Sequence, residues 1–321
     1  MNRVGGDPHP EVQGGARAAG GSVPPSHVGA APAWRTAHSS LSLARPLVMG
    51  VINLTPDSFS DGGRYRDVDH ALEVARAMVE AGAGVVDVGG ESTRPGAAPV
   101  PAREELRRIL PFVERAAADV PAPLSVDTRK AAVAHAALER GAAAINDVSG
   151  LSYDPRMGGV VAEAGAGLVL MHMRGGPEDM ARRAEYTDVV GEVADELGRA
   201  VERALAAGVE REALVVDPGI GFAKGAGHSL ALLGDLGPVR ALGLPILVGP
   251  SRKSFLGAVL STPVSDRLAG TLAACVAAYF QGARIFRVHD VEPVVQALAV
   301  AEAIARERIQ REESTLEGSV R

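Results

Sequence analysis

The sequence predicts an α/β protein folded as a (β/α)8 TIM barrel. Eight short apolar runs alternate with Ala-rich amphipathic stretches along most of the 321-residue chain. Parallel strands that are joined by helices are covered on both faces, so they are apolar along their whole length. Eight such units favour closure into a barrel. An open, doubly wound sheet is the main competing fold.

The expected strands are short and rich in Val, Ile and Leu, as fully buried parallel strands are. In chain order they are Leu47–Asn53, Val85–Gly89, Leu124–Asp127, Ala144–Asp147, Leu168–His172, Leu214–Asp217, Ile246–Gly249 and Ile285–His289. The intervening stretches show helical spacing, and several end beside a glycine, which readily adopts the left-handed conformation that ends a helix. They include Val68–Ala81, Arg103–Ala118, Ala131–Arg140, Val189–Ala207 and Val291–Arg306.

No long linker interrupts this alternation, so we expect a single barrel domain over residues 41–307. Residues 1–40 are rich in Gly, Pro, Ala and Ser and lack apolar periodicity. Such a composition buries too little apolar surface to order itself, which predicts a disordered N-terminal extension. Residues 308–321 are polar, and we expect them to form a frayed C-terminal tail.

The composition excludes several functional classes. Hydrophobic residues make up 46% of the chain and charged residues 22%, which is typical of a globular protein with a large core. The net charge of −6 predicts no general nucleic-acid surface, and no apolar run is long enough to predict a membrane span. A single cysteine, Cys275, excludes internal disulfides and is expected to be buried. We therefore expect a cytoplasmic protein.

Lysine is rare in this chain. Only three of the 33 basic residues are lysine, namely Lys130, Lys224 and Lys253. Lys and Arg present different geometries, so a retained lysine can mark a place where a compact ammonium group is needed. Chance survival of these three residues is the alternative.

Polar side chains follow the expected strands at their carboxyl ends. In a barrel these ends lie on one rim, where active sites are built. The polar positions are Asn53, residues 91–94, Asp127, Asn146, His172, Asp217, residues 251–253, Arg287 and His289.

The chemistry of this rim favours a heterocycle that carries a phosphate or diphosphate. The carboxylates of Asp127 and Asp217 and the amide of Asn146 suit adjacent N–H donors of a ring, because a carboxylate can accept two such bonds. Cations at the last two strands suit phosphate, which barrels often bind there. They are Arg252, Lys253, Arg287 and His289, joined by Arg94 from the second loop. Neither a Walker nor a Rossmann phosphate motif is present.

Seven segments, taken together and in order, resemble the dihydropteroate synthases. They include GVINLTPDSFSDGG at 50–63, DVGGESTRPG at 87–96, DPGIGFAK at 217–224 and SRKS at 251–254. The others are Ser125–Thr128, Ile145–Val148 and Arg287–Val291. The resemblance implies a transferase that joins (7,8-dihydropterin-6-yl)methyl diphosphate to 4-aminobenzoate in folate synthesis. It also implies Mg²⁺ as the cofactor and a homodimer formed by outer helices near the C-terminus.

The resemblance implies a role for each matching residue. Asn53 corresponds to the residue that binds the magnesium–diphosphate end, and Arg287 and His289 to its diphosphate grip, with Arg94 nearby. The pterin side corresponds to Asp127, Asn146, Asp217 and Lys253. The 4-aminobenzoate side corresponds to Thr93, Pro95, Phe222 and Ser251. We take Lys253 and Arg287 as catalytic candidates.

Asp61 is a further catalytic candidate, on chemical grounds. Loss of diphosphate leaves a cation-like pterin methylene, which a nearby carboxylate can stabilise. Asp61 lies in the first loop beside Gly62 and Gly63, which would let that loop close over the site and exclude water.

Other interpretations stay open. Asn146 could cap a helix, Asp217 could form a turn before Pro218, and His172 could be a packed strand-end residue. Glu91 could brace the second loop instead of contacting substrate, and Arg252 could serve the fold. Ala223 stands where many family members carry Gly, which leaves the geometry of its loop open.

Two other functions compete with a synthase. A pterin-binding barrel of the methyltetrahydrofolate methyltransferase kind would need no diphosphate grip, so Arg287 and His289 argue against it. A non-catalytic paralogue would only bind pterin, but Asn53, Asp61 and Lys253 are all present.

Overall fold

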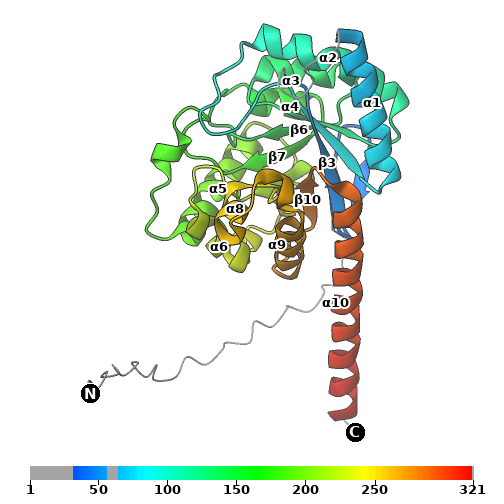
Figure 1. Cartoon of the computed structure of the whole chain (residues 1–321), viewed down its shortest axis with the longest axis vertical. Helices are drawn as coiled ribbons and strands as arrows, with labels where there is room; N and C mark the ends of the chain where they lie inside the picture. Colours follow the sequence, from blue (N-terminus) through cyan, green and yellow to red (C-terminus); the bar gives the residue numbers. More distant parts are fainter. Residues whose placement is uncertain (1–31, 56–63, 320–321) are drawn as a thin grey trace, which may run out of the picture. The chain divides into compact units, whose positions relative to one another are not determined.

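The computed structural model describes residues 32–55 and 64–319 of the chain (Figure 1). Eight parallel strands form the central sheet in the order β8-β7-β6-β5-β4-β3-β10-β9. A parallel bridge between Val216 and Ile246 joins the two ends of this sheet. The sheet is therefore closed, which confirms the barrel and rules out the open competitor. The strands are β3 (Leu47–Asn53), β4 (Val85–Gly89), β5 (Leu124–Asp127), β6 (Ala144–Asp147), β7 (Gly167–Met171), β8 (Leu214–Asp217), β9 (Leu247–Val248) and β10 (Ile285–Val288).

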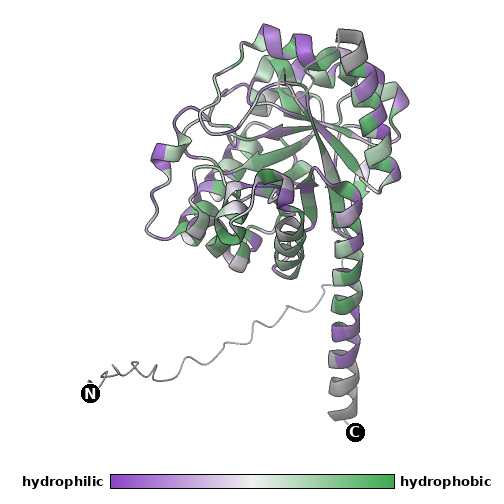
Figure 2. Ribbon diagram, viewed as in Figure 1, coloured by the Kyte–Doolittle hydropathy of each residue, from purple (hydrophilic) through white to green (hydrophobic). Residues whose placement is uncertain are grey.

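Helices surround the barrel, and the strands inside are mostly hydrophobic (Figures 1 and 2). The helices pack apolar faces against the strands, as in the single large core that includes Leu72, Phe112 and Leu197. They are α1 (Arg64–Glu80), α2 (Ala102–Asp119), α3 (Ala131–Leu138), α4 (Met157–Glu163), α5 (Val189–Ala206), α6 (Ala226–Gly234), α7 (Gly237–Arg240), α8 (Ser254–Leu260), α9 (Leu268–Phe280) and α10 (Val291–Ser319).

An apolar floor and a polar layer occupy the inside of the barrel. The floor is a separate buried cluster made of Met49, Val85, Ala144, Val169, Val215, Leu247 and Ile285, with Trp34 and Leu43 packed below. Side chains alternate across a strand, so the residue two positions further on points to the same side. At four strands that residue is polar, namely Asp87, Asn146, Asp217 and Arg287. These four, together with Asp127 at the end of β5, are called the polar layer below.

A short hairpin covers the floor of the barrel. Strands β1 (Ala33–Arg35) and β2 (Ser40–Ser42) pair antiparallel. Trp34 is fully buried, and its indole Nε1 donates a hydrogen bond to the carbonyl of Ala213 at 2.9 Å. Residues 33–40, predicted as part of the disordered extension, therefore belong to this hairpin, and residues 1–31 of that prediction lie outside the described residues. The overall Gly/Pro-rich composition of residues 1–40 did not reveal that Trp34 is buried against the barrel.

The C-terminal end also differs from the prediction. Helix α10 continues from Val291 to Ser319, so residues 308–319 extend a helix and do not form a separate tail. Cys275 is buried on α9, as predicted, and burial raises the pKa of its thiol to about 12. Within the described ranges, no helix is both long and apolar enough to cross a membrane.

Candidate active site

Arg287 joins three strands of the barrel through the polar layer. Its guanidinium Nε donates to Asp87 Oδ2 at 2.6 Å, and Nη2 donates to Asp127 Oδ2 at 2.7 Å. Asp87 is fully buried, and Asp127 is nearly so. Strands β10, β4 and β5 thus contribute side chains that meet inside the barrel, as the strand-end pattern predicted for Arg287 and Asp127.

Burial dominates the electrostatics of the carboxylates. It raises the pKa of Asp127 to about 7, although the Arg287 guanidinium opposes this shift. It also raises the pKa of Asp217 to about 6, against a hydrogen bond from the Gly219 backbone N–H at 2.7 Å. Asp217 can therefore change protonation near neutral pH, so it can accept or donate a hydrogen bond to a ring, whereas Asp127 accepts from Arg287.

Asn146 brings unused hydrogen-bonding capacity into the same space. Its Nδ2 donates to Asp87 Oδ2 at 3.3 Å. Its own Oδ1 and the Oδ1 of Asp87 are buried without any partner among the described residues, and so is Ser125 Oγ. Unpartnered buried acceptors are costly and point to a polar ligand or ordered water. Asn146 lies at the end of β6 and is not a helix cap, because its side chain bonds to β4.

Lys253 and Phe222 form the wall next to Asp217. The Lys253 ammonium lies 3.7 Å from the centre of the Phe222 ring, in a cation–π contact. Burial, together with the like charge of Arg287, lowers the pKa of Lys253 to about 7. Phe222 is buried in a small apolar cluster with Met171, Met173 and three other residues.

Ser251 and His289 pair at the carboxyl ends of β9 and β10. Ser251 Oγ lies 3.0 Å from His289 Nδ1 and also accepts a hydrogen bond from the His289 backbone N–H at 3.3 Å. Burial lowers the pKa of His289 to about 4. Arg252 lies outside this pair: it is exposed and forms an ion pair with Asp290 at 2.6 Å. This contact agrees with the alternative interpretation, in which Arg252 serves the fold.

The second loop carries three of the predicted residues. Thr93 is half-buried and Arg94 and Pro95 are exposed. Among the described residues, neither the Thr93 nor the Arg94 side chain forms a hydrogen bond or ion pair. Glu91 braces the loop, because it accepts from Lys130 Nζ at 2.9 Å and from the Val100 backbone N–H at 2.7 Å.

Asn53 and Asp61 complete the predicted set. Asn53 ends β3 and is half-buried. It follows the floor residue Met49 by four positions, so it shares the interior side of the strand. Asp61 lies outside the described residues. In the part of the chain that is described, no three His, Cys, Asp or Glu side chains are grouped to hold a metal ion.

Two features were missed by the sequence analysis. Asp87 was not among the candidates because it lies in the middle of its strand. In the structure it accepts hydrogen bonds from both Arg287 and Asn146 within the polar layer. An acidic residue inside an apolar run was the signal that could have identified it. The second feature is a buried pair, Lys224 and His172, whose side-chain nitrogens lie 2.8 Å apart. His172 is thus packed behind the Phe222 wall, which agrees with the structural alternative.

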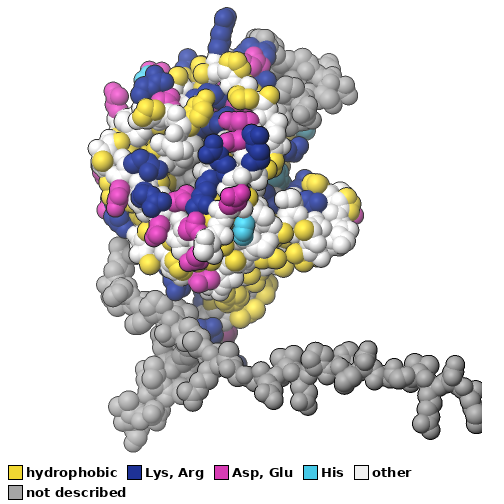
Figure 3. All heavy atoms as spheres, turned by 90° about the vertical axis from the view of Figure 1, so that its left-hand side faces the viewer, with side chains coloured by type: hydrophobic (Ala, Val, Ile, Leu, Met, Phe, Trp, Pro, Cys, Tyr) yellow, Lys and Arg dark blue, Asp and Glu magenta, His cyan; other side chains and the backbone are white. Residues whose placement is uncertain are grey.

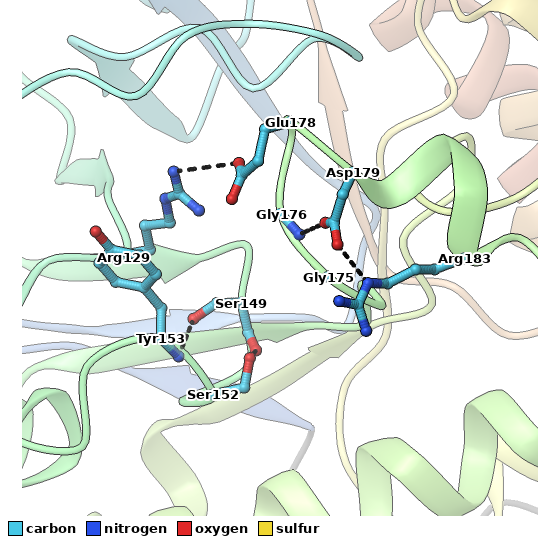
Figure 4. Close-up of a pocket in the computed structure, with 9 residues that line it drawn as sticks. All are labelled: Arg129, Ser149, Ser152, Tyr153, Gly175, Gly176, Glu178, Asp179 and Arg183. Atoms are coloured by element: carbon cyan, nitrogen blue, oxygen red, sulfur yellow. Dashed lines mark hydrogen bonds and ion pairs between the residues drawn. The ribbon is translucent and has the colours of Figure 1, made fainter.

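A separate hollow of about 280 Å³ opens on the same rim, above β5, β6 and β7 (Figure 4). Its charged side chains are paired: Arg129 lies 3.9 Å from Glu178 and stacks over the Tyr153 ring, and Arg183 pairs with Asp179. None of the predicted site residues lines it.

The surface shows no segregation of charge on the face drawn in Figure 3. Basic and acidic side chains are interspersed there. This face therefore offers no patch of a single charge sign for a strongly charged partner.

Comparison with known proteins identifies what the chain is similar to. Residues 49–289 match the family model described as pterin binding enzyme. The dihydropteroate synthase of Escherichia coli K12 is 46% identical over 265 residues, which cover 83% of this chain and 94% of that protein.

Two solved structures give the same result. One is Xanthomonas albilineans dihydropteroate synthase with 4-aminobenzoic acid, which is 43% identical, covers 86% of this chain and 98% of its own, and has a TM-score of 0.80. The other is the same enzyme in complex with 7,8-dihydropteroate, at 41% identity, 85% and 99% coverage and a TM-score of 0.77.

Proposed function

The chain belongs to the pterin-binding enzymes, among the dihydropteroate synthases, and from this premise we propose how its residues share the work. The enzyme is a transferase of folate biosynthesis that makes 7,8-dihydropteroate and diphosphate from (7,8-dihydropterin-6-yl)methyl diphosphate and 4-aminobenzoate. The polar layer is the structural observation that carries this conclusion, because it sets buried acceptors and one cation inside the barrel mouth. The relatives reported above are dihydropteroate synthases, which favours the synthase over the methyltransferase alternative.

The pterin ring would bind in the polar layer. The unpartnered Oδ1 atoms of Asn146 and Asp87 are acceptors that suit ring N–H groups. Asp127 and Asp217 would accept further hydrogen bonds from ring N–H groups. Burial raises the pKa of both residues, as expected for a site from which water is excluded. Lys253, at the same mouth, would donate to a ring oxygen or nitrogen.

The diphosphate would leave past Arg287 and His289. The C–O bond to the methylene breaks, and its electron pair leaves with the diphosphate, while the amine nitrogen forms the new C–N bond and loses a proton. Arg287 places a permanent positive charge beside this path, although it is shared with Asp87 and Asp127. Arg94 is exposed and unpaired among the described residues, so it is free to add a second cation.

Asn53 fits a magnesium ion that is shared with the substrate. Its amide oxygen is a hard ligand of the kind that Mg²⁺ takes. With no cluster of three acidic or imidazole ligands in the described residues, the substrate's own phosphate oxygens would supply most of the coordination, as is common for Mg²⁺. The ion would neutralise charge on the departing diphosphate. Calorimetry of Mg²⁺ with diphosphate should show weaker joint binding to Asn53→Ala than to the wild type; equal binding would remove Asn53 from this role.

The 4-aminobenzoate would bind against Phe222 and Ser251, closed by the second loop with Thr93 and Pro95. The arylamine attacks a carbon that is already cation-like, so it needs no strong general base. Asp61, whose position is outside the described residues, remains our candidate for stabilising that carbon.

We also propose that the enzyme is a cytoplasmic homodimer. Large apolar side chains are exposed on α9 and α10, among them Phe280 (42%), Val300 (62%) and Ile304 (56%). Val300 and Ile304 are one turn apart on α10, and such an apolar face favours a partner. Light scattering should give twice the chain mass for the wild type and one chain mass for Ile304→Arg. A wild-type monomer would contradict the proposal.

The direct test of the reaction is product formation. Purified chain with both substrates and magnesium should form 7,8-dihydropteroate and diphosphate in equal amounts. Well-folded protein that forms neither product from authentic substrates would contradict the function.

A further inference from the structure

Behind the Phe222 wall lies a buried lysine whose partners are a histidine and backbone carbonyls. The Lys224 ammonium contacts His172 Nδ1 at 2.8 Å, the Phe222 carbonyl at 2.9 Å and the His172 carbonyl at 3.3 Å. Lys224 is only 8% exposed and forms no ion pair among the described residues. Burial lowers its pKa to about 7. A buried ammonium is costly, so its retention among only three lysines needs a reason.

Glu196 fixes the orientation of His172, the side-chain partner of Lys224. His172 Nε2 lies 2.9 Å from Glu196 Oε2. The hydrogen bond with His172 lowers the pKa of Glu196 to about 2, so Glu196 is an acceptor and His172 Nε2 must donate. His172 is neutral, because burial lowers its pKa to about 4. Its Nδ1 is therefore an acceptor, and the Lys224 N–H donates to it.

The loop that carries Phe222 is strained and needs such support. Gly219, Gly221 and Ala223 all have positive φ, of 68°, 79° and 47°. Ala223 has a side chain, so its left-handed conformation costs roughly 1–2 kcal/mol. A Cβ on Gly219 would lie 2.1 Å from the His172 carbonyl oxygen, which shows how closely this loop packs on β7.

Two hydrogen bonds fix the peptide groups that follow Phe222. The Lys224 ammonium donates to the Phe222 carbonyl, and the Tyr186 hydroxyl donates to the Ala223 carbonyl at 3.0 Å. Tyr186 is itself held under the Arg174 guanidinium, which lies 4.1 Å from the centre of its ring. Arg174 also bonds to Glu196, so both supports belong to one network.

We propose that Lys224 is a positioning residue for the reaction: between His172 and the backbone of residues 219–223, it holds the Phe222 ring beneath the Lys253 ammonium. Rigid placement of an aromatic wall fixes the attack angle of the arylamine, and small displacements of a reactant lower the rate. This inference rests on the proposed function, because it assigns Phe222 to the 4-aminobenzoate side.

The network predicts a selective defect. Three acceptors of the proposed pterin side, Asp87, Asp127 and Asn146, lie on β4, β5 and β6, and their contacts do not involve Lys224. Only Asp217 lies on β8, the strand that leads into the supported loop. Loss of the Lys224 ammonium should therefore disturb 4-aminobenzoate and leave the pterin substrate nearly untouched. A general weakening of the fold would not separate the two substrates in this way.

The test compares Lys224→Met with the wild type in steady-state kinetics, varying each substrate in turn. Methionine keeps the length and burial but leaves the His172 and Phe222 acceptors without a donor. We expect KM for 4-aminobenzoate to rise about tenfold, as for the loss of one charged hydrogen bond, with KM for the pterin diphosphate within about twofold. Equal rises in both KM values, or no change in either, would overturn the proposal.

Two further variants keep the result interpretable. Trp34→Phe removes a buried hydrogen bond at the opposite end of the barrel, so it should lower Tm without changing either KM. Tyr186→Phe removes only the bond to Ala223; if Lys224→Met does not fold, Tyr186→Phe should still raise KM for 4-aminobenzoate selectively, by about threefold. An unchanged KM in Tyr186→Phe would then overturn the proposal, whereas an inactive wild type would refute the function itself.

Discussion

Arg287 Nε lies 2.6 Å from Asp87 Oδ2, although the two residues are on strands that are not neighbours in the barrel. Arg287 also contacts Asp127, so one cation is shared by two buried acids. The Arg287 guanidinium, which we expect to contact the diphosphate, is therefore already held in place by these acids before any ligand binds. Such preorganisation spares the enzyme a rearrangement when charge develops on the leaving group.

Removal of Arg287 should destabilise the substrate-free protein. Arg287→Met leaves Asp87 and Asp127 buried without their cation, so we expect the free energy of unfolding to fall by about 3–5 kcal/mol. Urea denaturation measures this change. Arg252→Met is the matched control, because it breaks an exposed pair with Asp290 and should cost at most about 1 kcal/mol. Equal effects of the two substitutions would contradict the buried-network interpretation.

Asp217 should make stability depend on pH. Burial raises its pKa from 3.8 to about 6, so between these values the folded state holds a proton that the unfolded state has lost. Its contribution to stability is therefore present below pH 3.8 and is lost as pH rises through about 6. In Asp217→Asn the free energy of unfolding should decline less between pH 4.5 and pH 7. Identical declines, measured by urea denaturation in both proteins, would show that Asp217 does not titrate this way.

Lys253 should matter for substrate binding and not for folding. Its ammonium makes no hydrogen bond among the described residues, and burial lowers its pKa to about 7. Lys253→Ala should therefore leave Tm near the wild-type value while KM for the substrates rises about tenfold or more, as for the loss of a charged hydrogen bond. Unchanged kinetics would remove Lys253 from the site.

The N-terminal segment should divide at the hairpin. Deleting residues 1–31 should leave both Tm and activity close to the wild type. Deleting residues 1–40 also removes Trp34 from the barrel floor, and loss of a buried Trp typically costs about 3–5 kcal/mol. Thermal unfolding of the two truncated chains separates these outcomes. A shorter deletion that is as damaging as the longer one would show that the first segment contributes to the fold.

Most of the barrel could be predicted because its strands are buried on both faces. The predicted bounds of β3, β4, β5, β6 and β8 agree with the structure. Strand β9 is shorter than predicted, covering only Leu247–Val248, because apolar runs do not show where pairing stops.

The site was harder to predict where it depends on contacts between residues that are far apart in the sequence. Asp127 and Asn146 could be predicted as site residues because they lie at strand ends, which form one rim of a barrel. Asp87 lies two residues before the end of β4, and it contacts Arg287 only because the sheet closes into a barrel. The link between Lys224 and His172 spans 52 residues and has no local pattern. Trp34 was missed because the composition of residues 1–40 was averaged over a segment that holds a short hairpin.

The most direct test is a crystal structure with the pterin substrate or a close analogue. We predict that ring N–H groups will lie within about 3.2 Å of Asp217, Asn146 and Asp127, with the diphosphate end toward Arg287 and His289. A pterin ring bound outside the polar layer, for example in the hollow beside Arg129 and Tyr153, would contradict the assignment of this site.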